Sequence, residues 1–590
     1  MKRTHTCNEL TTKDIGKKAC LQGWVHSRRD HGGVIFLDLR DRYGLTQAVF
    51  EPGCKPFSDA EHLRREDCIE VHGAVRARPK GMSNANLFTG EVEVDVKELK
   101  VHNKSAVAPF EVDDRVVASD DLRLKYRYLD LRRPTMQHNL LIRHRAAQAA
   151  RKFLSSQNFM EVETPLLVRS TPEGARDYIV PSRVNPGTFY ALPQSPQLYK
   201  QILMVSGCDR YFQLARALRD EDLRADRQPE HTQIDIEMSF PEIEDLFTVG
   251  EGVISAIYKE CINTELKRPF PKITHTHAME TYGTDKPDLR YELFLIDVSA
   301  IVKTSDFKVF SDVVGKGGVV KCICAPADIA RNELDNYISF CQQHGAKGMA
   351  WARVTELGLE SSIAKFLSPQ IQKELIAKTN AKKGTTLLFI ADTLKTTNQV
   401  LDKLRQKLAH DLGLLKGKEK EFKFCWVVDF PLFDWNEEED KWEPAHHPFC
   451  MPYEDDLKYL ETDPGKVKCT QYDLVLNGTE LASGSIRIHT PDIQERVMKV
   501  IGLSKKDLEN KFGFLLESFK YGAPPHGGMG IGFDRVVASM LNLIDIREVI
   551  AFPKNKAAQC PMDGSPSDVD AKQLKELHIK LDIVKKEAKQ

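Results

Sequence analysis

The sequence lacks a surplus of charge of either sign. Its 590 residues include 84 Lys+Arg and 85 Asp+Glu, which gives a formal net charge of −1. The whole surface is therefore not expected to capture a charged partner. Long apolar runs are also missing, because no hydrophobic stretch follows the first charged residues and no segment approaches the roughly 18 apolar residues of a membrane span. We expect a cytoplasmic protein with no membrane partner.

Several common motifs are absent. The 13 cysteines are scattered, and the closest pair, Cys322-x-Cys324, lacks the two-residue spacer of zinc and redox motifs, so reduced and mostly buried thiols are expected. The glycines of 413–417 stand too close together for a P-loop, and those of 528–532 have G-x-G-x-G spacing instead of the dinucleotide fingerprint. No Ser-His-Asp or Cys-His arrangement is apparent, so we expect no enzyme nucleophile.

The N-terminal hundred residues have the pattern of a small β-barrel. About five short strands separated by turn residues follow Lys18, and the first fifty residues carry a local charge of +4. In the strand that begins at Val34, Phe36 falls on the polar face, close in sequence to Arg28 and Arg29. A base-stacking platform of an OB-type barrel is one interpretation. An isolated exposed phenylalanine is the other.

Further along, the pattern changes three times. The arginine-rich stretch 123–134 resembles a hinge, and it is followed by a helix through Ile142 and Phe153 and by a strand predicted over 159–167. Between about Tyr291 and Phe422, short strands alternate with helices and no catalytic constellation is found. This segment is predicted to be a separate inserted domain.

Two polar segments could carry chemistry. Residues 212–238 have a strand, loop and strand pattern in which Gln233, Asp235 and Glu237 share one face, and the arginines of the loop suit a polyanionic ligand. A surface hairpin rich in ion pairs would have the same composition. Farther on, the acidic pair Asp473 and Glu480 precedes an arginine, which fits a magnesium-bound phosphate or, alternatively, a cross-strand salt bridge.

A third segment combines glycines with an arginine. Gly528, Gly530 and Gly532 allow a close approach of the backbone to a planar ligand, and Arg535 begins an apolar helix from which it could reach a ring or a terminal phosphate. Taken together, the segments resemble the signature motifs of the class II aminoacyl-tRNA synthetases. The helix and strand that end at Pro165 resemble motif 1, residues 219–237 resemble motif 2, and residues 528–535 resemble motif 3. The residues at these motifs resemble those of the bacterial-type aspartyl-tRNA synthetases.

The resemblance implies an α+β multidomain fold with an antiparallel catalytic sheet. The expected parts are an OB-fold anticodon-binding domain (1–108), a hinge (109–138), a first catalytic part (139–288), an inserted α/β domain of the GAD type (289–422), a second catalytic part (423–555) and a C-terminal extension (556–590). Motif 1 implies a homodimer.

The resemblance also assigns roles to residues. Aspartate binding is expected at Glu173, Gln197, Lys200, Arg219, Asp235, His446 and Arg487. ATP binding is expected at Arg219, Asp220, Glu221, Gln228, Glu480, Gly532, Phe533, Asp534 and Arg535. Mg²⁺ is expected at Asp473 and Glu480, and the anticodon at Arg29, His31, Phe36, Gln47 and Gly81. Of these, Arg219, Arg535 and Glu480 are the expected catalytic residues.

The implied reaction activates L-aspartate with ATP to aspartyl-adenylate and transfers it to the 3′ end of tRNA-Asp. His31 and Gly81 resemble the pattern of enzymes that also charge tRNA-Asn, and an imidazole can face either C or U at the base in which the two anticodons differ. An amidotransferase partner would then convert Asp-tRNA-Asn. The alternatives are an enzyme strict for tRNA-Asp, a synthetase for asparagine or lysine, and a repurposed RNA-binding paralogue.

Overall fold

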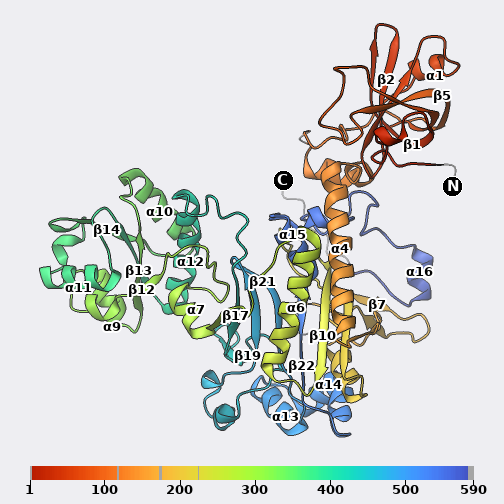
Figure 1. The fold of residues 1–590 in the computed structure, drawn as a ribbon. Helices are drawn as coiled ribbons and strands as arrows, with labels where there is room; N and C mark the ends of the chain where they lie inside the picture. The colour runs from red at the N-terminus through yellow and green to blue at the C-terminus, as the bar shows by residue number, and fades with distance from the viewer. Residues whose placement is uncertain (1–2, 116–117, 172–175, 224, 583–590) are drawn as a thin grey trace. The chain divides into compact units, whose positions relative to one another are not determined.

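The computed structural model describes residues 3–115, 118–171, 176–223 and 225–582 (Figure 1). Contacts divide the chain into two compact units, each of which is described by itself. The first comprises Met1–His144, Leu223–Gln228 and Asp545–Asp568, and the second comprises Arg145–Asp222, Pro229–Ile544 and Val569–Gln590. The finer division into six parts stays a prediction.

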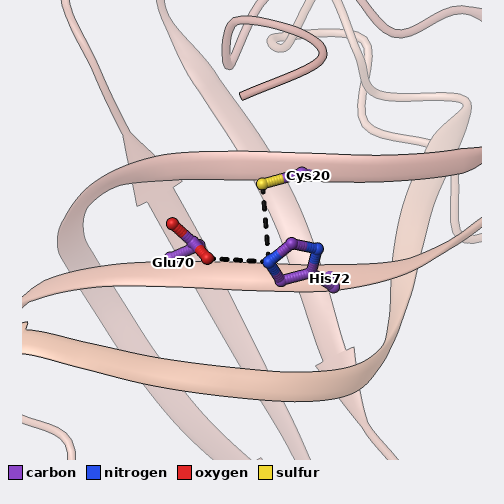
Figure 2. A group of neighbouring side chains, drawn as sticks. All are labelled: Cys20, Glu70 and His72. Atoms are coloured by element: carbon purple, nitrogen blue, oxygen red, sulfur yellow. Dashed lines mark hydrogen bonds and ion pairs between the residues drawn. The ribbon is translucent and has the colours of Figure 1, made fainter. Parts of the chain in front are cut away.

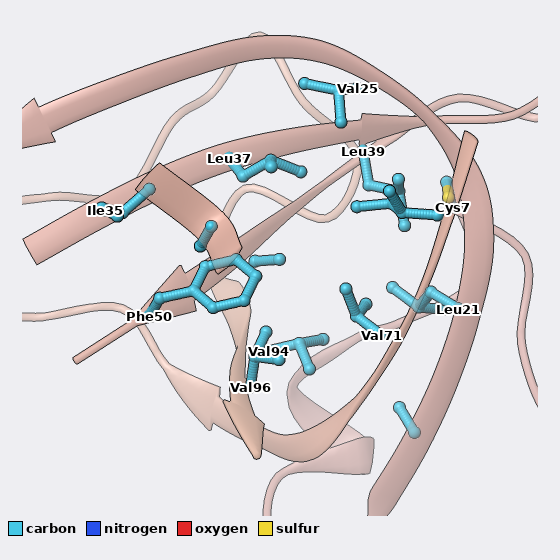
Figure 3. Packing of buried hydrophobic residues seen from close by; sticks show 14 of the residues in the cluster. Cys7, Leu21, Val25, Ile35, Leu37, Leu39, Phe50, Val71, Val94 and Val96 are labelled. Carbon is cyan, nitrogen blue, oxygen red and sulfur yellow. The ribbon is translucent and has the colours of Figure 1, made fainter. Parts of the chain in front are cut away.

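A closed five-stranded barrel with strand order β1-β2-β3-β5-β4 lies in the first unit. Its strands are β1 (Lys18–His31), β2 (Val34–Arg40), β3 (Leu45–Phe50), β4 (Cys68–Ala77) and β5 (Val92–Asn103), with η1 (Thr12–Asp14) before β1 and α1 (Phe57–Glu61) before β4. Alternate residues such as Leu21, Ile35 and Leu37 fill the interior, as Figure 3 shows. The predicted small barrel is confirmed.

The turn between β1 and β2 has the form that its sequence predicts. Gly32 and Gly33 have φ values of +62° and +80°, which a two-residue hairpin of type I′ requires at both positions. The hairpin aligns Arg29 with Phe36 as a directly opposite pair. These two side chains therefore lie next to each other on the outer face of the barrel.

The arginine-rich connector is helical. It contains α2 (Asp120–Lys125), α3 (Arg127–Asp130) and the start of α4 (Pro134–Ser156). Arg127 is buried and donates to Asp130 and to the backbone carbonyls of Arg547, Ile550 and Ala551 within the same unit. The connector is thus held by buried polar contacts, and its action as a hinge stays a prediction.

The second unit is built around an eight-stranded sheet of order β11-β17-β20-β21-β22-β10-β9-β6. The strands are β6 (Met160–Glu161), β9 (Arg210–Leu218), β10 (Glu230–Ser239), β11 (Lys272–Thr274), β17 (Phe424–Val428), β20 (Tyr472–Leu476), β21 (Thr479–Ile486) and β22 (His526–Gly532). The six central strands are antiparallel, and the edge strands β11 and β6 run parallel to their neighbours. The predicted antiparallel sheet is confirmed.

Helices and small hairpins accompany this sheet. They are α5 (Gln197–Val205), α6 (Ile243–Ile262), α7 (His275–Thr281), α13 (Pro491–Val500), α14 (Lys505–Phe519), α15 (Phe533–Met540), α16 (Ala571–Glu576), the short helices η3 (Glu454–Tyr459) and η4 (Pro464–Lys466), and the hairpins β7 (Ile179–Pro181) with β8 (Phe189–Ala191) and β18 (Phe433–Asn436) with β19 (Lys441–Pro444). In the first unit, η5 (Ile546–Val549) follows the sheet in sequence.

The strand predicted over 159–167 is wrong in length. Only Met160 and Glu161 pair with β9, and Val162 adds one more backbone hydrogen bond, to Phe212. Pro165 has no N–H to donate to a ladder, so the segment leaves the sheet before it.

The inserted segment forms a sheet of its own, of order β12-β13-β16-β14-β15. Its elements are β12 (Leu295–Asp297), α8 (Ser299–Val302), α9 (Lys308–Gly315), β13 (Val319–Ala325), α10 (Arg331–Gln343), β14 (Ala350–Thr355), β15 (Gly358–Glu360), η2 (Ala364–Phe366), α11 (Pro369–Thr379), β16 (Thr386–Asp392) and α12 (Leu394–Asp411). Strands alternate with helices along this segment as predicted, and in the sheet β16 lies between β13 and β14 and runs antiparallel to both. Alternation of strands and helices in sequence did not produce neighbouring parallel strands.

Two other predictions can be compared with the structure. None of the thirteen cysteines, all of which lie in the described residues, forms a disulfide, and eight are buried, as expected. Among the described residues, no helix is both long enough and apolar enough to cross a membrane.

Candidate active site

Two carboxylates lie on β10, an interior strand of the eight-stranded sheet. Asp235 and Glu237 alternate with Ile234 and Ile236 along β10, which pairs with β9 on one side and β22 on the other. Because successive side chains of a strand point to opposite faces, the isoleucines enter the core while the carboxylates share the other face. Both carboxylates are buried.

Two buried cations neutralise these carboxylates. The Nζ of Lys200, from α5, lies 3.0 Å from Asp235 Oδ1 and 3.4 Å from Glu237 Oε2. Arg487, directly after β21, donates from Nε and Nη2 to the two oxygens of Glu237 at 3.0 and 3.2 Å. We call these four side chains the buried quartet. Buried charges need such pairing, since an unpaired charge in the interior is strongly unfavourable.

The guanidinium of Arg487 is saturated with partners. Besides the two bonds to Glu237, Nη1 lies 2.9 Å from Ser485 Oγ and 3.0 Å from His447 Nε2, and Nη2 donates to the carbonyl of Gly528 at 2.9 Å. A guanidinium has five N–H groups. All five are engaged, so a further carboxylate can bind Arg487 only if one partner moves.

The glycine at position 528 makes room for this arrangement. A Cβ there would lie 2.0 Å from the carbonyl oxygen of Ile236 and 2.3 Å from Glu237 Oε2. Close approach was predicted for the glycine-rich segment. At Gly528 the groups that approach closely are the carbonyl of Ile236 and the buried carboxylate of Glu237, both on the neighbouring strand β10.

Burial and pairing shift the two carboxylates in opposite directions. Burial raises the pKa of Asp235, and Lys200 offsets only part of this effect. Burial also acts on Glu237, but Arg487 and Lys200 outweigh it and lower the pKa of that carboxyl. Asp235 Oδ2 is buried and has no hydrogen-bond partner. This oxygen is a ready acceptor for a cationic group of a ligand.

A second group of charges lies beyond the ends of β9 and β22. Arg219 follows β9, and its buried Nε has no hydrogen-bond partner. Arg535, on α15, donates to the backbone carbonyl of Glu480 at 3.1 Å. His231, at the start of β10, was missed by the sequence reasoning; burial, Arg219 and Arg535 lower the pKa of its imidazole to about 4. Two arginines and a neutral imidazole therefore share one neighbourhood.

The acidic pair of the β20–β21 hairpin is brought together as predicted. Asp473 is fully buried and neither of its carboxylate oxygens has a hydrogen-bond partner. Burial and Glu480 raise the pKa of Asp473 well above its usual range. Lys286 Nζ lies 3.2 Å from Glu480 Oε2, and this lysine helps to outweigh burial, so the pKa of Glu480 is lowered. Lys286 is almost 200 residues away in sequence, and no local pattern indicated it.

Several predicted residues have other partners in the structure. The amide of Gln228 bonds twice to the backbone of Lys554 in the first unit, at 2.8 and 3.2 Å. Asp534 Oδ2 accepts the N–H of Thr232 at 2.8 Å, and Gln197 donates to Gln201 at 3.0 Å. The binding roles of Gln197, Gln228 and Asp534 stay predictions. Glu173 lies outside the described residues.

The remaining candidates of the second unit occupy its loops and helix starts. Asp220 pairs with Arg176 through its backbone, Glu221 is half-buried in the loop after β9, and Gly532 and Phe533 lie where β22 passes into α15. His446 Nε2 lies 3.9 Å from Asp473 Oδ1 and 3.4 Å from Ser483 Oγ.

The predicted anticodon residues lie on the barrel of the first unit. Arg29 is opposite Phe36, and Asp38, which Arg29 holds at 3.1 and 3.2 Å, is opposite Gln47. His31 is exposed at the end of β1, and Gly81 is exposed in the loop after β4 with φ of +84°. The sequence analysis did not single out Arg78. Its Nη2 is buried in the structure and has no hydrogen-bond partner, and in the sequence only the positive charge of Arg78 suggests an anionic ligand.

Family models match both units of the chain. Residues 119–556 match the model described as tRNA synthetases class II (D, K and N). Residues 19–101 match the model described as OB-fold nucleic acid binding domain.

Curated relatives cover nearly the whole chain. Proteins named aspartate–tRNA(Asp/Asn) ligase from Geotalea uraniireducens and Treponema denticola are 52% and 51% identical, and each alignment covers 98% of this chain and 98% and 99% of the relative. Among solved structures, the asparaginyl-tRNA synthetase of Pyrococcus horikoshii with asparaginyl-adenylate has a TM-score of 0.58 at 21% identity, covering 94% of this chain and 98% of that one. The aspartyl-tRNA synthetase of Entamoeba histolytica has a TM-score of 0.56 at 19% identity, covering 94% and 92%. The predicted resemblance is confirmed, and the chain belongs to the class II aminoacyl-tRNA synthetases.

Proposed function

We propose that this chain is an aspartate–tRNA ligase that charges both tRNA-Asp and tRNA-Asn. The observation that carries the proposal is the buried quartet, in which Lys200 of α5 and Arg487 pair with Asp235 and Glu237 of β10. Relatives about 50% identical over nearly the full chain bear the corresponding name. ATP is a substrate throughout this family.

The quartet suits aspartate because its own charges cancel. With two carboxylates and two cations, it can accept a side-chain carboxylate at Lys200 and an α-ammonium at Asp235 Oδ2 while staying neutral. The carboxamide of asparagine would leave the cationic side of the site without an anion. A buried group left without its partner is the strongest available basis for rejecting a close analogue.

Arg219, which follows β9, and Arg535, in the helix after β22, suit the triphosphate of ATP. In the proposed reaction, the aspartate α-carboxylate attacks the α-phosphorus of ATP in line, and pyrophosphate leaves. Arg219 would neutralise the charge that develops at the α-phosphate, and Arg535 would hold the far end of the triphosphate. The terminal hydroxyl of tRNA then takes the aspartyl group. Catalysis by positioning and charge neutralisation needs no enzyme nucleophile.

Asp473 and Glu480 fit a magnesium ion. The buried oxygens of Asp473 have no hydrogen-bond partner, and a second carboxylate raises its pKa. Mg²⁺ is commonly bound by one or two carboxylates together with substrate phosphates. When bound, the ion would supply charge neutralisation for the triphosphate. In its absence, Lys286 partly balances Glu480.

The barrel is proposed to bind the anticodon through Arg29, Phe36 and Gln47, with His31 and Gly81 setting tolerance for the last base. Acceptance of tRNA-Asn implies an amidotransferase that converts the mischarged product.

Homodimer formation is supported by exposed apolar side chains in the segment that resembles motif 1, because Met160, Leu166 and Leu167 are each more than half exposed. A cytoplasmic location belongs to the same proposal.

The test is aminoacylation of purified tRNA-Asp and tRNA-Asn transcripts with labelled aspartate. We expect charging of both, at rates within about tenfold of each other. Charging of tRNA-Asp alone would overturn the relaxed specificity. Failure to charge either, or faster activation of asparagine than of aspartate in pyrophosphate exchange, would overturn the proposed function.

A further inference from the structure

A group of potential metal ligands lies on the outer face of the barrel, outside the sites described above. Figure 2 shows Cys20 of β1 with Glu70 and His72 of β4. His72 Nε2 lies 3.6 Å from Cys20 Sγ and 2.7 Å from Glu70 Oε1. From β5, His102 Nε2 lies 3.5 Å from the other oxygen of Glu70. We call these four side chains the barrel cluster.

The register of the barrel fixes this arrangement. Cys20 and His72 are directly opposite each other in the antiparallel pair of β1 and β4. Glu70 is two residues before His72, so both point to the same face. Their alternating neighbours, Leu21 and Val71, are fully buried in the barrel core. A rigid ladder therefore positions the ligands, which is what a preformed metal site needs.

The burial of the cluster is uneven. Cys20 is only 3% exposed although it lies on the outer face. The N-terminal segment runs alongside it, since Thr4 N–H donates to the Cys20 carbonyl at 3.0 Å and Cys20 N–H donates to Thr4 Oγ1 at 2.8 Å. The imidazoles of His72 and His102 are 39% and 33% exposed. The thiol is covered, whereas the imidazole side gives an ion a path from solvent.

We propose that the barrel cluster binds a divalent transition-metal ion, with Zn²⁺ the best match. The ligands are Cys20 Sγ, His72 Nε2 and one oxygen of Glu70, whose ligand atoms all lie within 4.8 Å of one another. With Zn–S of about 2.3 Å and Zn–N of about 2.05 Å, a tetrahedral angle separates sulfur and nitrogen by about 3.6 Å. The observed separation of Cys20 Sγ and His72 Nε2 is 3.6 Å.

The carboxylate needs a small adjustment. A tetrahedral site separates a nitrogen and an oxygen ligand by about 3.4 Å, whereas Glu70 Oε1 and His72 Nε2 are 2.7 Å apart in a hydrogen bond. A shift of less than about 1 Å opens this pair, which a rotation about the Glu70 side chain provides. Thiolate and imidazole donors favour zinc over magnesium or calcium, which prefer oxygen ligands alone.

The alternative is a hydrogen-bonded network without a metal. Gln22 and His72 both donate to Glu70, so the carboxylate is satisfied without an ion. The two interpretations differ in what they require at position 72. In a network, any donor that reaches Glu70 suffices, whereas a metal site needs an imidazole there. His72→Gln separates them, because a glutamine amide keeps the donor and removes the ligand.

The experiment is a titration of the full-length, reduced and chelator-treated protein with Co²⁺ and then Zn²⁺. We expect one equivalent of Co²⁺ to bind with a near-ultraviolet thiolate-to-cobalt absorption band, which Zn²⁺ then abolishes. Zinc should also raise the thermal midpoint. Cys20→Ser should lose the band, and His72→Gln should weaken Co²⁺ binding more than about 100-fold, since even the partners of metal ligands contribute 10- to 100-fold.

A matched control and a folding check accompany these variants. Cys54→Ser removes a half-buried thiol of the same barrel that is not part of the cluster, and it should bind Co²⁺ like the parent protein. Unchanged aspartate-dependent pyrophosphate exchange confirms that each variant is folded. A parent protein without the thiolate band, or a His72→Gln variant with the parent's affinity, would overturn the proposal. If Cys20→Ser fails to fold, His72→Gln still decides the question, because the imidazole of His72 is 39% exposed and its replacement opens no buried cavity.

Discussion

Replacement of Lys200 by methionine isolates the contribution of the quartet to aspartate binding. Methionine has nearly the same length and no charge, so the change removes a cation without opening a large cavity. Lys200 Nζ lies 3.0 Å from Asp235 and 3.4 Å from Glu237, all three side chains being buried. Without it, two buried carboxylates share the single cation of Arg487, and an incoming aspartate would add a third.

The expected loss of aspartate binding follows from the burial of Lys200 and its two carboxylate partners. Truncation of one partner of a buried charge pair costs about 2–5 kcal/mol in binding, and 1.4 kcal/mol is a factor of ten. The saturated fork of Arg487 cannot compensate, because its five N–H groups already have partners. We therefore expect the KM for aspartate to rise by about 30- to 4000-fold.

Aspartate-dependent pyrophosphate exchange measures this change, with the KM for ATP as an internal reference. Lys321→Met is a matched control, since Lys321, on β13 of the inserted sheet, is equally buried but donates to Asn398 of α12. It should leave both KM values within about threefold of the parent. If Lys200→Met raised the aspartate KM by less than tenfold, or raised the ATP KM equally, the quartet would not be the aspartate site.

Three further perturbations test other features. Asp473→Asn should abolish exchange yet stabilise the fold by about 1 kcal/mol at pH 7, which raises the thermal midpoint of a unit of this size by about 1 °C. The raised pKa of Asp473 means that its charge destabilises the fold above pH 3.8, so the gain should vanish in acid. An equal gain at pH 3 would contradict this reasoning. His31→Leu combined with Gly81→Lys should reduce charging of tRNA-Asn at least tenfold relative to tRNA-Asp, as measured on transcripts; unchanged charging would remove these residues from discrimination. Leu166→Glu should shift the mass measured by light scattering toward that of a monomer, and an unaltered dimer would exclude this patch from the interface.

Local patterns predicted the parts of the site that lie on single strands. The alternation of 233–237 placed Asp235 and Glu237 on one face, and the turn residues of the first hundred residues predicted the short strands of the barrel. Such features depend on side-chain period and turn geometry, which neighbouring residues determine.

Long-range contacts were not predictable in this way. Lys286 approaches Glu480 from a segment almost 200 residues earlier, and Gln228 bonds to the backbone of Lys554. The strand order of the inserted sheet was not predictable either, because its last strand in sequence, β16, lies between β13 and β14. The barrel cluster was missed because Cys20 and His72 meet only across the ladder of β1 and β4.

The position of β10 has a consequence for synthesis of the chain. This strand ends at Ser239, but its neighbour β22 begins only at His526. At about 5–20 residues per second, the edge that β22 will cover waits for roughly 15 to 60 s on the ribosome. An unpaired edge is a template for pairing with other nascent chains, and inward-pointing charges are one way in which proteins protect such edges. Asp235 and Glu237 would thus keep the unfinished sheet from aggregating before they hold any substrate.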